Sequence, residues 1–230
     1  VDSGSTIYSS NSAVESGGAI YNTSNGDVTL VEDTLTLNSA PQRGGAINNY
    51  GLLTISDTSI THNVSDEGAA IATARNLDMT ESVVNYNDAV TDGGGIHNDE
   101  VGVVSVTRST FVGNTAGDDG GALSNVDSGV MSLEFSSLSG NQAGSDGGGV
   151  HNTSASGLTV SASLLYDNEA IGGGGGVAND SIGVATAVNT TFSGNQAATG
   201  GGVFNLGEFE LNHSTVYKNF ANVGGGVANA

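Results

Sequence analysis

A glycine motif recurs nine times along this 230-residue chain, and no other feature limits its fold as strongly. Each copy is a run of small residues, mostly glycine, followed by Ile, Leu or Val. The aliphatic residues that close the nine motifs are Ile20, Ile47, Ile71, Ile96, Leu123, Val150, Val177, Val203 and Val227. Repeats of about 26 residues that run from end to end predict a solenoid in which each repeat forms one coil.

Two asparagine positions keep the same spacing from the glycine motif in successive repeats. The first lies two residues after the aliphatic residue and is Asn in every repeat except the third, which has Thr73. The second is unbroken and comprises Asn11, Asn38, Asn63, Asn87, Asn114, Asn141, Asn168, Asn195 and Asn219. Because stacked amides can satisfy one another inside a protein, we expect two inward-facing ladders of asparagine side chains.

The apolar residues of each repeat have the spacing of short strands. An apolar residue stands three positions before each second-column Asn. In the second to ninth repeats an apolar pair separated by one residue stands eight and ten positions before it, as Val104 and Val106 do for Asn114. Such pairs indicate strands with one buried face. We therefore predict an all-β, single-domain, right-handed parallel β-helix over residues 1–230. It would contain nine coils of three short strands each, stacked about 4.8 Å apart.

Charge limits the partners that this chain can take. The sequence has 24 acidic residues against four Lys and Arg, and its formal net charge is −20. Such a surface repels phosphate backbones and anionic headgroups, so we expect neither nucleic-acid binding nor direct membrane insertion. The chain has no Cys, which excludes disulfides and thiolate metal sites.

Two short motifs resemble a known family. Gly-Gly-Ala-Ile at residues 44–47, and Phe-x-x-Asn from Phe111 to Asn114 and from Phe192 to Asn195, resemble repeats of chlamydial polymorphic outer-membrane proteins and related bacterial surface adhesins. The resemblance covers the whole chain. It implies an extracellular β-helix on the cell surface that functions in adhesion, with a cell-surface or polysaccharide ligand as the expected partner.

Some parallel β-helices are polysaccharide lyases or glycosidases, so catalysis is the main alternative. A lyase acting on anionic sugars needs clustered basic residues, but Arg43, Arg75 and Arg108 stand at different positions of the repeat. A glycosidase needs two carboxylates about 5 to 9.5 Å apart, which stacked acids could supply. The acidic column lacks the aromatic platform of a sugar cleft, because the chain has twelve Phe and Tyr in all and the Phe mostly occupy core positions. We predict a noncatalytic structural or adhesive β-helix with no catalytic residues. The alternative is a carbohydrate-active enzyme or a carbohydrate-binding module.

One column of acids suits a metal ion. The position four residues before the motif aliphatic holds, in the second to sixth repeats, Arg43, Glu67, Asp92, Asp119 and Asp146. Three Asp on successive coils would lie about 5 Å apart and offer the hard oxygen ligands that calcium prefers. We predict a calcium edge formed by Asp92, Asp119 and Asp146 with Asp118 beside them. The alternative is a solvated acidic edge, and no other cofactor is expected.

The histidines do not predict a metal site. His97 and His151 share one position of the repeat, but Ser124 lies between them, so they would be about 10 Å apart and could not bind one metal ion. His62 and His213 match neither. We expect all four at the surface. The outward column of the apolar-pair strand mixes Thr, Ser and acids, which favours an ordinary solvated strand over an ice-binding array.

The two ends of the sequence stand at corresponding points of the repeat. Val1 lies ten residues before Asn11, where an apolar-pair strand begins, and Ala230 follows the ninth glycine motif. Uncapped coils would expose strand edges and core side chains. We therefore expect head-to-tail self-association through the ends of the β-helix, which would propagate into a filament. The alternative is that these residues are part of a longer β-helix whose caps lie outside them.

Overall fold

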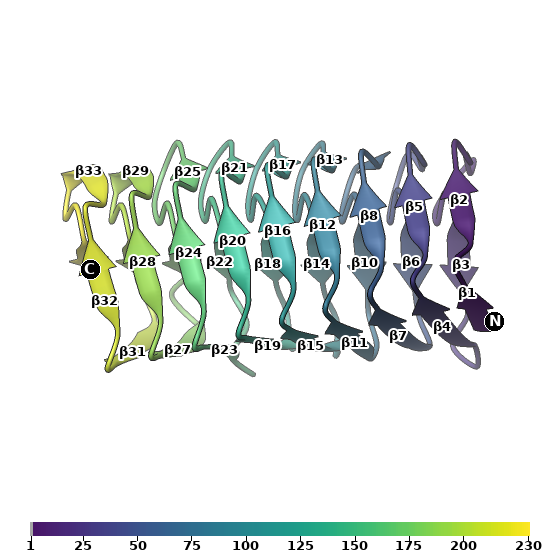
Figure 1. Ribbon diagram of the computed structural model, residues 1–230. Helices are drawn as coiled ribbons and strands as arrows, with labels where there is room; N and C mark the ends of the chain where they lie inside the picture. The colour runs from purple at the N-terminus through teal and green to yellow at the C-terminus, as the bar shows by residue number, and fades with distance from the viewer. Residues whose placement is uncertain (1) are drawn as a thin grey trace.

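The computed structural model describes residues 2–230 as a parallel β-helix (Figure 1). Its coils lie side by side in sequence order, from the purple N-terminal coil to the yellow C-terminal coil (Figure 1). Every strand pairs in parallel with its copies in the neighbouring coils, as the repeat predicts. Within residues 2–230, no helix is long and apolar enough to cross a membrane.

Four sheets run along the solenoid, and we number them in the order in which the chain enters them in each coil. Sheet 1 holds the apolar-pair strands β1 (Asp2–Gly4), β4 (Asp27–Val31), β7 (Leu52–Ser56), β11 (Leu77–Thr80), β15 (Val103–Thr107), β19 (Val130–Glu134), β23 (Leu158–Ser161), β27 (Val184–Val188) and β31 (Glu208–Asn212). Sheet 2 holds β2 (Ile7–Ser9), β5 (Thr34–Thr36), β8 (Ser59–Thr61), β12 (Val83–Asn85), β16 (Thr110–Val112), β20 (Ser137–Ser139), β24 (Leu164–Tyr166), β28 (Thr191–Ser193) and β32 (Thr215–Tyr217).

The other two sheets close each coil. Sheet 3 holds the short strands β9 (Val64–Ser65), β13 (Asp88–Ala89), β17 (Thr115–Ala116), β21 (Gln142–Ala143), β25 (Glu169–Ala170), β29 (Gln196–Thr199) and β33 (Phe220–Val223). Sheet 4 holds the glycine-motif strands β3 (Ile20–Asn22), β6 (Ile47–Asn49), β10 (Ile71–Thr73), β14 (Ile96–Asn98), β18 (Leu123–Asn125), β22 (Val150–Asn152), β26 (Val177–Asn179), β30 (Val203–Asn205) and β34 (Val227–Asn229).

Sheet 3 was missed by the sequence analysis, which predicted three strands in each coil. Most of its strands have only two residues and contribute one buried alanine, such as Ala89 or Ala143. One apolar residue cannot produce an alternating pattern, so the sequence carries no period-two signal for these strands. In the first coils the same position forms isolated bridges, for example between Ser39 and Val64.

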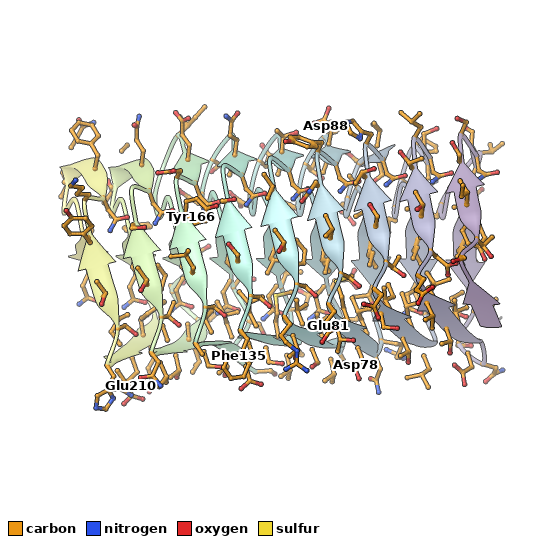
Figure 2. The ribbon with its side chains drawn as sticks, viewed as in Figure 1. Asp78, Glu81, Asp88, Phe135, Tyr166 and Glu210 are labelled. Atoms are coloured by element: carbon orange, nitrogen blue, oxygen red, sulfur yellow. The ribbon has the colours of Figure 1, made fainter. Side chains whose placement is uncertain are left out.

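The core is the stack of apolar columns that the repeat predicts. The glycine-motif aliphatics, the apolar pairs and the residue three before the second Asn form one continuous cluster of buried side chains. Phe111 and Phe192 are its largest members. By contrast, Asp78 and Glu210, in the outward column of sheet 1, point away from the solenoid (Figure 2).

Both predicted asparagine ladders are present. In the unbroken column, the Asn141 Nδ2 donates a hydrogen bond to Asn168 Oδ1 at 2.9 Å. In the other column, Asn98 Nδ2 donates to Asn125 Oδ1 at 2.8 Å. These amides are buried and span the inner corners of the coils, so they take the place that apolar side chains have elsewhere in the core.

The second ladder breaks at Thr73. The Thr73 hydroxyl accepts a hydrogen bond from Asn49 Nδ2 at 3.0 Å and donates its own proton to the Arg75 carbonyl at 3.0 Å. It therefore has no proton for the next coil, and the buried Asn98 Oδ1 receives no hydrogen bond from the part of the chain that the structure describes. The single exception in the sequence column thus leaves one orphaned acceptor.

Residues with a positive φ, in the left-handed backbone conformation, turn the chain between sheets. The first glycine of each motif has a positive φ, and a Cβ on Gly93 would lie 2.7 Å from the Ile96 carbonyl oxygen, so this position requires glycine. A second bend follows each sheet 1 strand, where non-glycine residues such as Phe135 (φ 49°) adopt the same conformation. Only the glycine bends were predicted, because the other bends carry no characteristic residue type.

Candidate functional site

The outward column of sheet 4 carries the polar groups that have chemical interest. The central residue of each sheet 4 strand points away from the core, because its two neighbours face inward. His97 and His151 nevertheless keep only 4% and 5% of their surface exposed, and Ser124 between them has none. The expectation that these two histidines lie at the surface is therefore wrong. His62 and His213 are exposed, as expected.

The glycine motif explains this burial. The first glycine of each motif folds the preceding residues against the strand, and a Cβ on Gly93 would come within 2.9 Å of the His97 Cα. The acidic column therefore lies along one side of the outward residues, and the turns that follow sheet 4 lie along the other. Side chains from both sides reach over the strand and cover the histidines.

The acidic column is a hydrogen-bonded ladder. Asp92 Oδ1 accepts a hydrogen bond from the Asp119 backbone N–H at 3.0 Å, and Asp119 Oδ1 accepts one from the Asp146 N–H at 2.8 Å. Asp146 Oδ1 likewise accepts a bond from the Gly173 N–H. These three Asp stack as predicted, and their Oδ1 atoms are engaged by the backbone. Asp118 beside them is exposed, and the calcium edge stays a prediction.

Arg43, Glu67, His97 and Asp99 form what we call the Arg43 cluster. Arg43 Nε lies 3.2 Å from Glu67 Oε2, and Arg43 Nη2 donates a hydrogen bond to Asp99 Oδ2 at 2.5 Å. Arg43 precedes sheet 4 in the second coil, whereas Asp99 follows it in the fourth. The arginine can span the coil between them because the outward residue there is the small, fully buried Ala72.

The Arg43 cluster has the spacing of a metal site but already contains a cation. Glu67, His97 and Asp99 each place one ligand atom within 4.8 Å of the others. Burial lowers the pKa of His97 to about 3, and the charges of Arg43 and His151 act in the same direction. The imidazole is therefore neutral, the form that binds metals. The Arg43 guanidinium contacts both carboxylates, so it supplies the positive charge that a metal ion would bring.

Asp119, His151 and Asp180 form a second group, which we call the His151 cluster. His151 Nδ1 lies 3.6 Å from Asp119 Oδ2, and His151 Nε2 lies 3.4 Å from Asp180 Oδ2. Burial acts to lower the pKa of His151, but the hydrogen bond to Asp180 and the charges of Asp119, Asp180 and Asp146 outweigh it and raise the pKa. His151 in turn lowers the pKa of Asp180.

Ser124 does not complete a nucleophilic site with His151. Its hydroxyl makes no hydrogen bond with any described residue, and its side chain is fully buried. Both ring nitrogens of His151 face carboxylates, so neither is placed to take a proton from Ser124. The outward column of sheet 4 therefore holds ion pairs rather than a nucleophile and its base.

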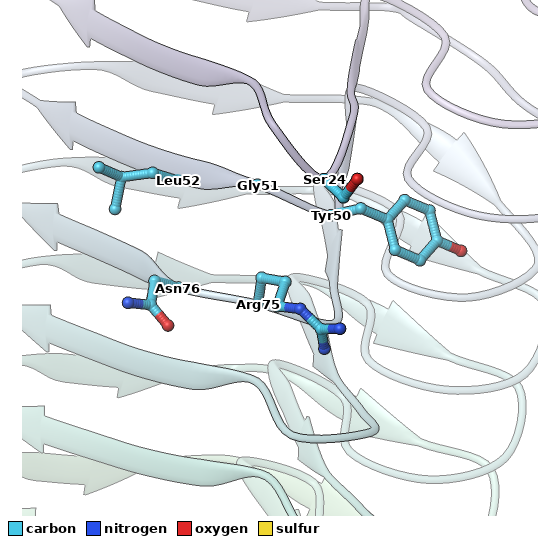
Figure 3. A pocket seen from close by; sticks show the side chains of 6 residues that line it. All are labelled: Ser24, Tyr50, Gly51, Leu52, Arg75 and Asn76. Carbon is cyan, nitrogen blue, oxygen red and sulfur yellow. The ribbon is translucent and has the colours of Figure 1, made fainter.

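A shallow hollow lies beside the Arg43 cluster, where the turns after sheet 4 are short (Figure 3). It has a volume of about 210 Å³ and is lined by Ser24, Tyr50, Gly51, Leu52, Arg75 and Asn76. A neighbouring hollow of about 260 Å³ is lined by Tyr21, Thr23, Ser24 and Tyr50. The Tyr21 and Tyr50 rings are 5.9 Å apart between centroids and tilted by 47°.

This tyrosine pair was missed by the sequence analysis. Tyr21 is the outward residue of a sheet 4 strand, whereas Tyr50 belongs to the next coil's turn, so the two occupy different positions of the repeat. The same reason hid the Arg43 and His151 clusters, since Asp99 and Asp180 are also turn residues. An alignment by repeat position compares residues in one column and does not show contacts that run diagonally across columns.

Comparison with known families adds one finding. Residues 108–126 match the Chlamydia polymorphic membrane protein repeat. The matched segment contains both predicted motifs, Phe-x-x-Asn from Phe111 to Asn114 and the glycine motif at residues 120–123. Searches of curated proteins and of solved structures find no match.

Proposed function

We propose that this chain is a noncatalytic, extracellular β-helix that functions in adhesion at a cell surface. The observation that carries this proposal is the repeat match at residues 108–126, because the same motif positions recur in every coil. The matched repeat belongs to a family of structural surface proteins rather than enzymes. A stack of such repeats offers a long, regular outer surface on which a ligand can be held.

The outward column of sheet 4 supports a noncatalytic role. The acids on either side of this column that reach over it are engaged in ion pairs or by backbone N–H groups, and Ser124 and the two histidines of the column are buried beneath them. A substrate could contact these groups only by displacing the ion-pair or hydrogen-bond partners that they already have. This arrangement favours a structural network along the solenoid over a reaction centre.

Adhesion is tested with beads coated with the purified chain. Coated beads should be retained on cultured epithelial cells or on extracellular-matrix films more strongly than beads coated with an unrelated protein of similar net charge. Equal retention of the two kinds of beads on every surface would contradict adhesion. In a parallel assay, incubation with a panel of polysaccharides should release no new reducing ends and no unsaturated products, and turnover of any of them would favour the enzyme alternative.

Head-to-tail association is a further part of the proposal. Coil nine exposes side chains from the apolar columns, including Val216 and Val227. Another coil that paired with β31, β32, β33 and β34 would cover them, and a second copy of the chain could supply that coil. Electron microscopy of the purified chain should then show rods that lengthen in steps of about 43 Å. Single particles at high concentration would contradict self-association.

A further inference from the structure

We propose that the hollow around Tyr21 and Tyr50 is a binding site for a neutral glycan and is the contact point of the adhesion proposed above, on which this inference rests. We call this site the tyrosine saddle and define it as Tyr21, Thr23, Ser24, Tyr50, Gly51, Leu52, Arg75 and Asn76. It lies on the outside of the first three coils. Its ligand would be held without being cleaved.

Differences in turn length create the saddle. The turn after sheet 4 spans residues 23–26 in the first coil and 99–102 in the fourth, but in the second and third coils the chain re-enters sheet 1 at Leu52 and Leu77 after shorter turns. The two shorter turns lie between two longer ones, which leaves a depression two coils wide. The same shortening makes the second and third repeats shorter than the first in the sequence.

The tyrosine pair supplies aromatic faces. Tyr21 is 55% exposed although it lies on a sheet strand, and its ring contacts that of Tyr50 in the next coil. Tyr50 lines both hollows, so its ring stands between them. The negative face of an aromatic ring attracts the weakly positive C–H groups of a sugar ring, and tyrosine combines an apolar ring with a polar hydroxyl.

Hydrogen-bonding groups surround these rings. Figure 3 shows Ser24 and Arg75 near Tyr50, with Leu52 and Asn76 on the other side of the turns. Ser24 and Asn76 are exposed, and the Asn76 side-chain amide makes no hydrogen bond within residues 2–230. Arg75 uses one nitrogen to donate a bond to the Ala74 carbonyl at 2.9 Å, and its other N–H groups are available. A few directed polar groups around an apolar surface are typical of small-ligand sites.

Charge selects a neutral ligand over an acidic one. Arg75 lies 3.6 Å from Glu100, and Arg43, beyond Tyr50, is held by Glu67 and Asp99. Both cations near the saddle are therefore balanced by carboxylates. The rest of the chain carries a large negative charge, which repels uronic and sialic acids.

The size of the saddle suits a short stretch of sugar. The two adjoining hollows, of about 210 and 260 Å³, are each smaller than the range of about 300 to 1,000 Å³ that small-ligand sites usually have, so the ligand would have to occupy both of them. The partly buried acids Glu67 and Asp99 are held by Arg43. The Arg43 cluster therefore offers the saddle no unpaired pair of carboxylates. Because glycoside hydrolysis usually needs such a pair, we expect the glycan to bind without being hydrolysed.

The first experiment measures binding by saturation-transfer NMR and calorimetry with the purified chain. The neutral probes are cellotetraose, mannotetraose, chitotetraose and lacto-N-tetraose, and the acidic probes are sialyllactose and tetragalacturonate. At least one neutral probe should bind, and more tightly than either acidic probe. Absence of binding by all neutral probes, or tighter binding of an acidic probe, overturns the proposal.

Matched variants then locate the site. Tyr50→Ala and Tyr21→Ala should each raise Kd by at least about tenfold, whereas Tyr50→Phe, which keeps the ring, should change it less than threefold. Tyr86→Ala is the control, because Tyr86 is exposed to the same degree as Tyr21 (54% against 55%) but follows a sheet 2 strand. Wild-type affinity in Tyr50→Ala and Tyr21→Ala, or an equal loss in Tyr86→Ala, overturns the assignment.

A turn exchange tests the shape of the saddle without removing a tyrosine. Replacing residues 74–76 with residues 99–103 of the following coil should fill the depression and abolish binding, while circular dichroism and thermal melting confirm that the chain is folded. Retained binding in this folded variant contradicts the site.

The bead assay separates this inference from the function on which it rests. If beads bearing Tyr50→Ala and Tyr21→Ala adhere as strongly as wild type, the saddle proposal fails and adhesion stands. If wild-type beads bind no surface, adhesion fails, and the NMR result alone decides whether the saddle binds glycans.

Discussion

His97 and His151 stand in the same column of one sheet, two coils apart, and are buried to nearly the same extent, yet their pKa values move in opposite directions. Burial acts to lower both. Next to His97, Arg43 adds a positive charge and the pKa falls to about 3. Around His151, the three carboxylates of Asp119, Asp180 and Asp146 outweigh burial and raise the pKa. The neighbouring charges, and not the degree of burial, therefore decide which histidine is protonated.

The difference arises from contacts that run diagonally across the coils. Arg43 reaches from the second coil to Asp99 after the fourth, and His151 connects Asp119 of the fifth coil with Asp180 after the seventh. Between Arg43 and Asp99 the outward residue is Ala72, which leaves space for a long side chain. A solenoid with an almost constant backbone can thus vary its chemistry through the pairs that meet across two or three coils.

The pH dependence of unfolding should give the largest effect. His97 has a folded pKa of about 3 against about 6.5 in the unfolded chain, so between these values the unfolded chain binds an extra proton. His97 should therefore lower the free energy of unfolding as pH falls from about 6.5 to 3, by up to about 1.4 kcal/mol per pH unit. His151, whose pKa is raised, should stabilise the folded chain. This contribution to the free energy of unfolding should be fully present below about pH 6.5 and lost as the pH rises through the folded pKa of His151.

Urea unfolding followed by circular dichroism at a series of pH values separates the two histidines. His97→Gln should flatten the curve on the acid side of about pH 6.5, and His151→Gln should flatten it on the alkaline side. If both variants change the same side of the curve of unfolding free energy against pH, the pKa values of the two histidines do not shift in opposite directions.

Removing Arg43 should give the next largest effect. Arg43→Met leaves Glu67 and Asp99 partly buried without their cation, which should cost about 2 to 3 kcal/mol of unfolding free energy. Proton NMR should show the pKa of His97 rising in the same variant. Arg108→Met is the matched control, because Arg108 pairs with Glu81 at the surface and should change stability by less than about 0.5 kcal/mol. Equal costs in the two variants would show that the Arg43 cluster behaves as a surface ion pair.

Calcium should stabilise the acidic edge beside His151. At a calcium concentration about ten times Kd, thermal or urea unfolding should show a gain of about 1.4 kcal/mol over a sample with chelator. Replacing Asp92, Asp119 and Asp146 by Asn should abolish the gain, whereas replacing the exposed Asp57, Asp78 and Asp88 by Asn should keep it. Identical wild-type melts with calcium and with chelator would end the calcium prediction.

Repairing the ladder beneath the Arg43 cluster should give the smallest effect. The ladder is broken at Thr73 in this region and continuous beneath His151. Thr73→Asn should restore the bond to Asn98 Oδ1 and raise the free energy of unfolding by about 1 kcal/mol. Thr54→Asn, on the outward side of sheet 1, makes the same replacement outside the ladder and should bring no gain. A gain in both variants, or in neither, would contradict the role of the orphaned acceptor.

The fold was predictable because each of its determinants repeats. Columns such as Leu138 and Asn141 recur at a fixed spacing, and a residue type that returns at the same place in every coil reports directly whether that place is buried. The stacked Asp92, Asp119 and Asp146 were found in the same way. The short sheet 3 escaped because Ala143 and its copies give no alternating pattern.

The chemistry of the outer face was not predictable to the same degree. His97 and His151 were expected at the surface because a polar outward residue of a strand is usually solvated. Their burial depends on side chains such as Asp180, which reach over the strand from turns of variable length. Tyr21 and Tyr50 meet for the same reason. Such contacts depend on the conformation of each turn, and an alignment of residues by repeat position does not predict that conformation.

The asparagine ladders also give the solenoid an electrical direction. Asn38 Nδ2 donates to Asn63 Oδ1, and Asn195 Nδ2 donates to Asn219 Oδ1, so each bond between neighbouring amides of the column runs toward the C-terminal coil. The same nitrogens also donate to carbonyl groups of the preceding coil, as Asn38 Nδ2 does to Tyr8. Aligned amide dipoles add along an axis and polarise one another, as peptide dipoles do in a helix. The column begins with the Asn11 amide oxygen and ends with the Asn219 amide, whose Nδ2 also donates to the Phe192 carbonyl oxygen of the preceding coil at 2.9 Å. Any coil that extends the stack, from the same chain or from another, can continue this column in one orientation only.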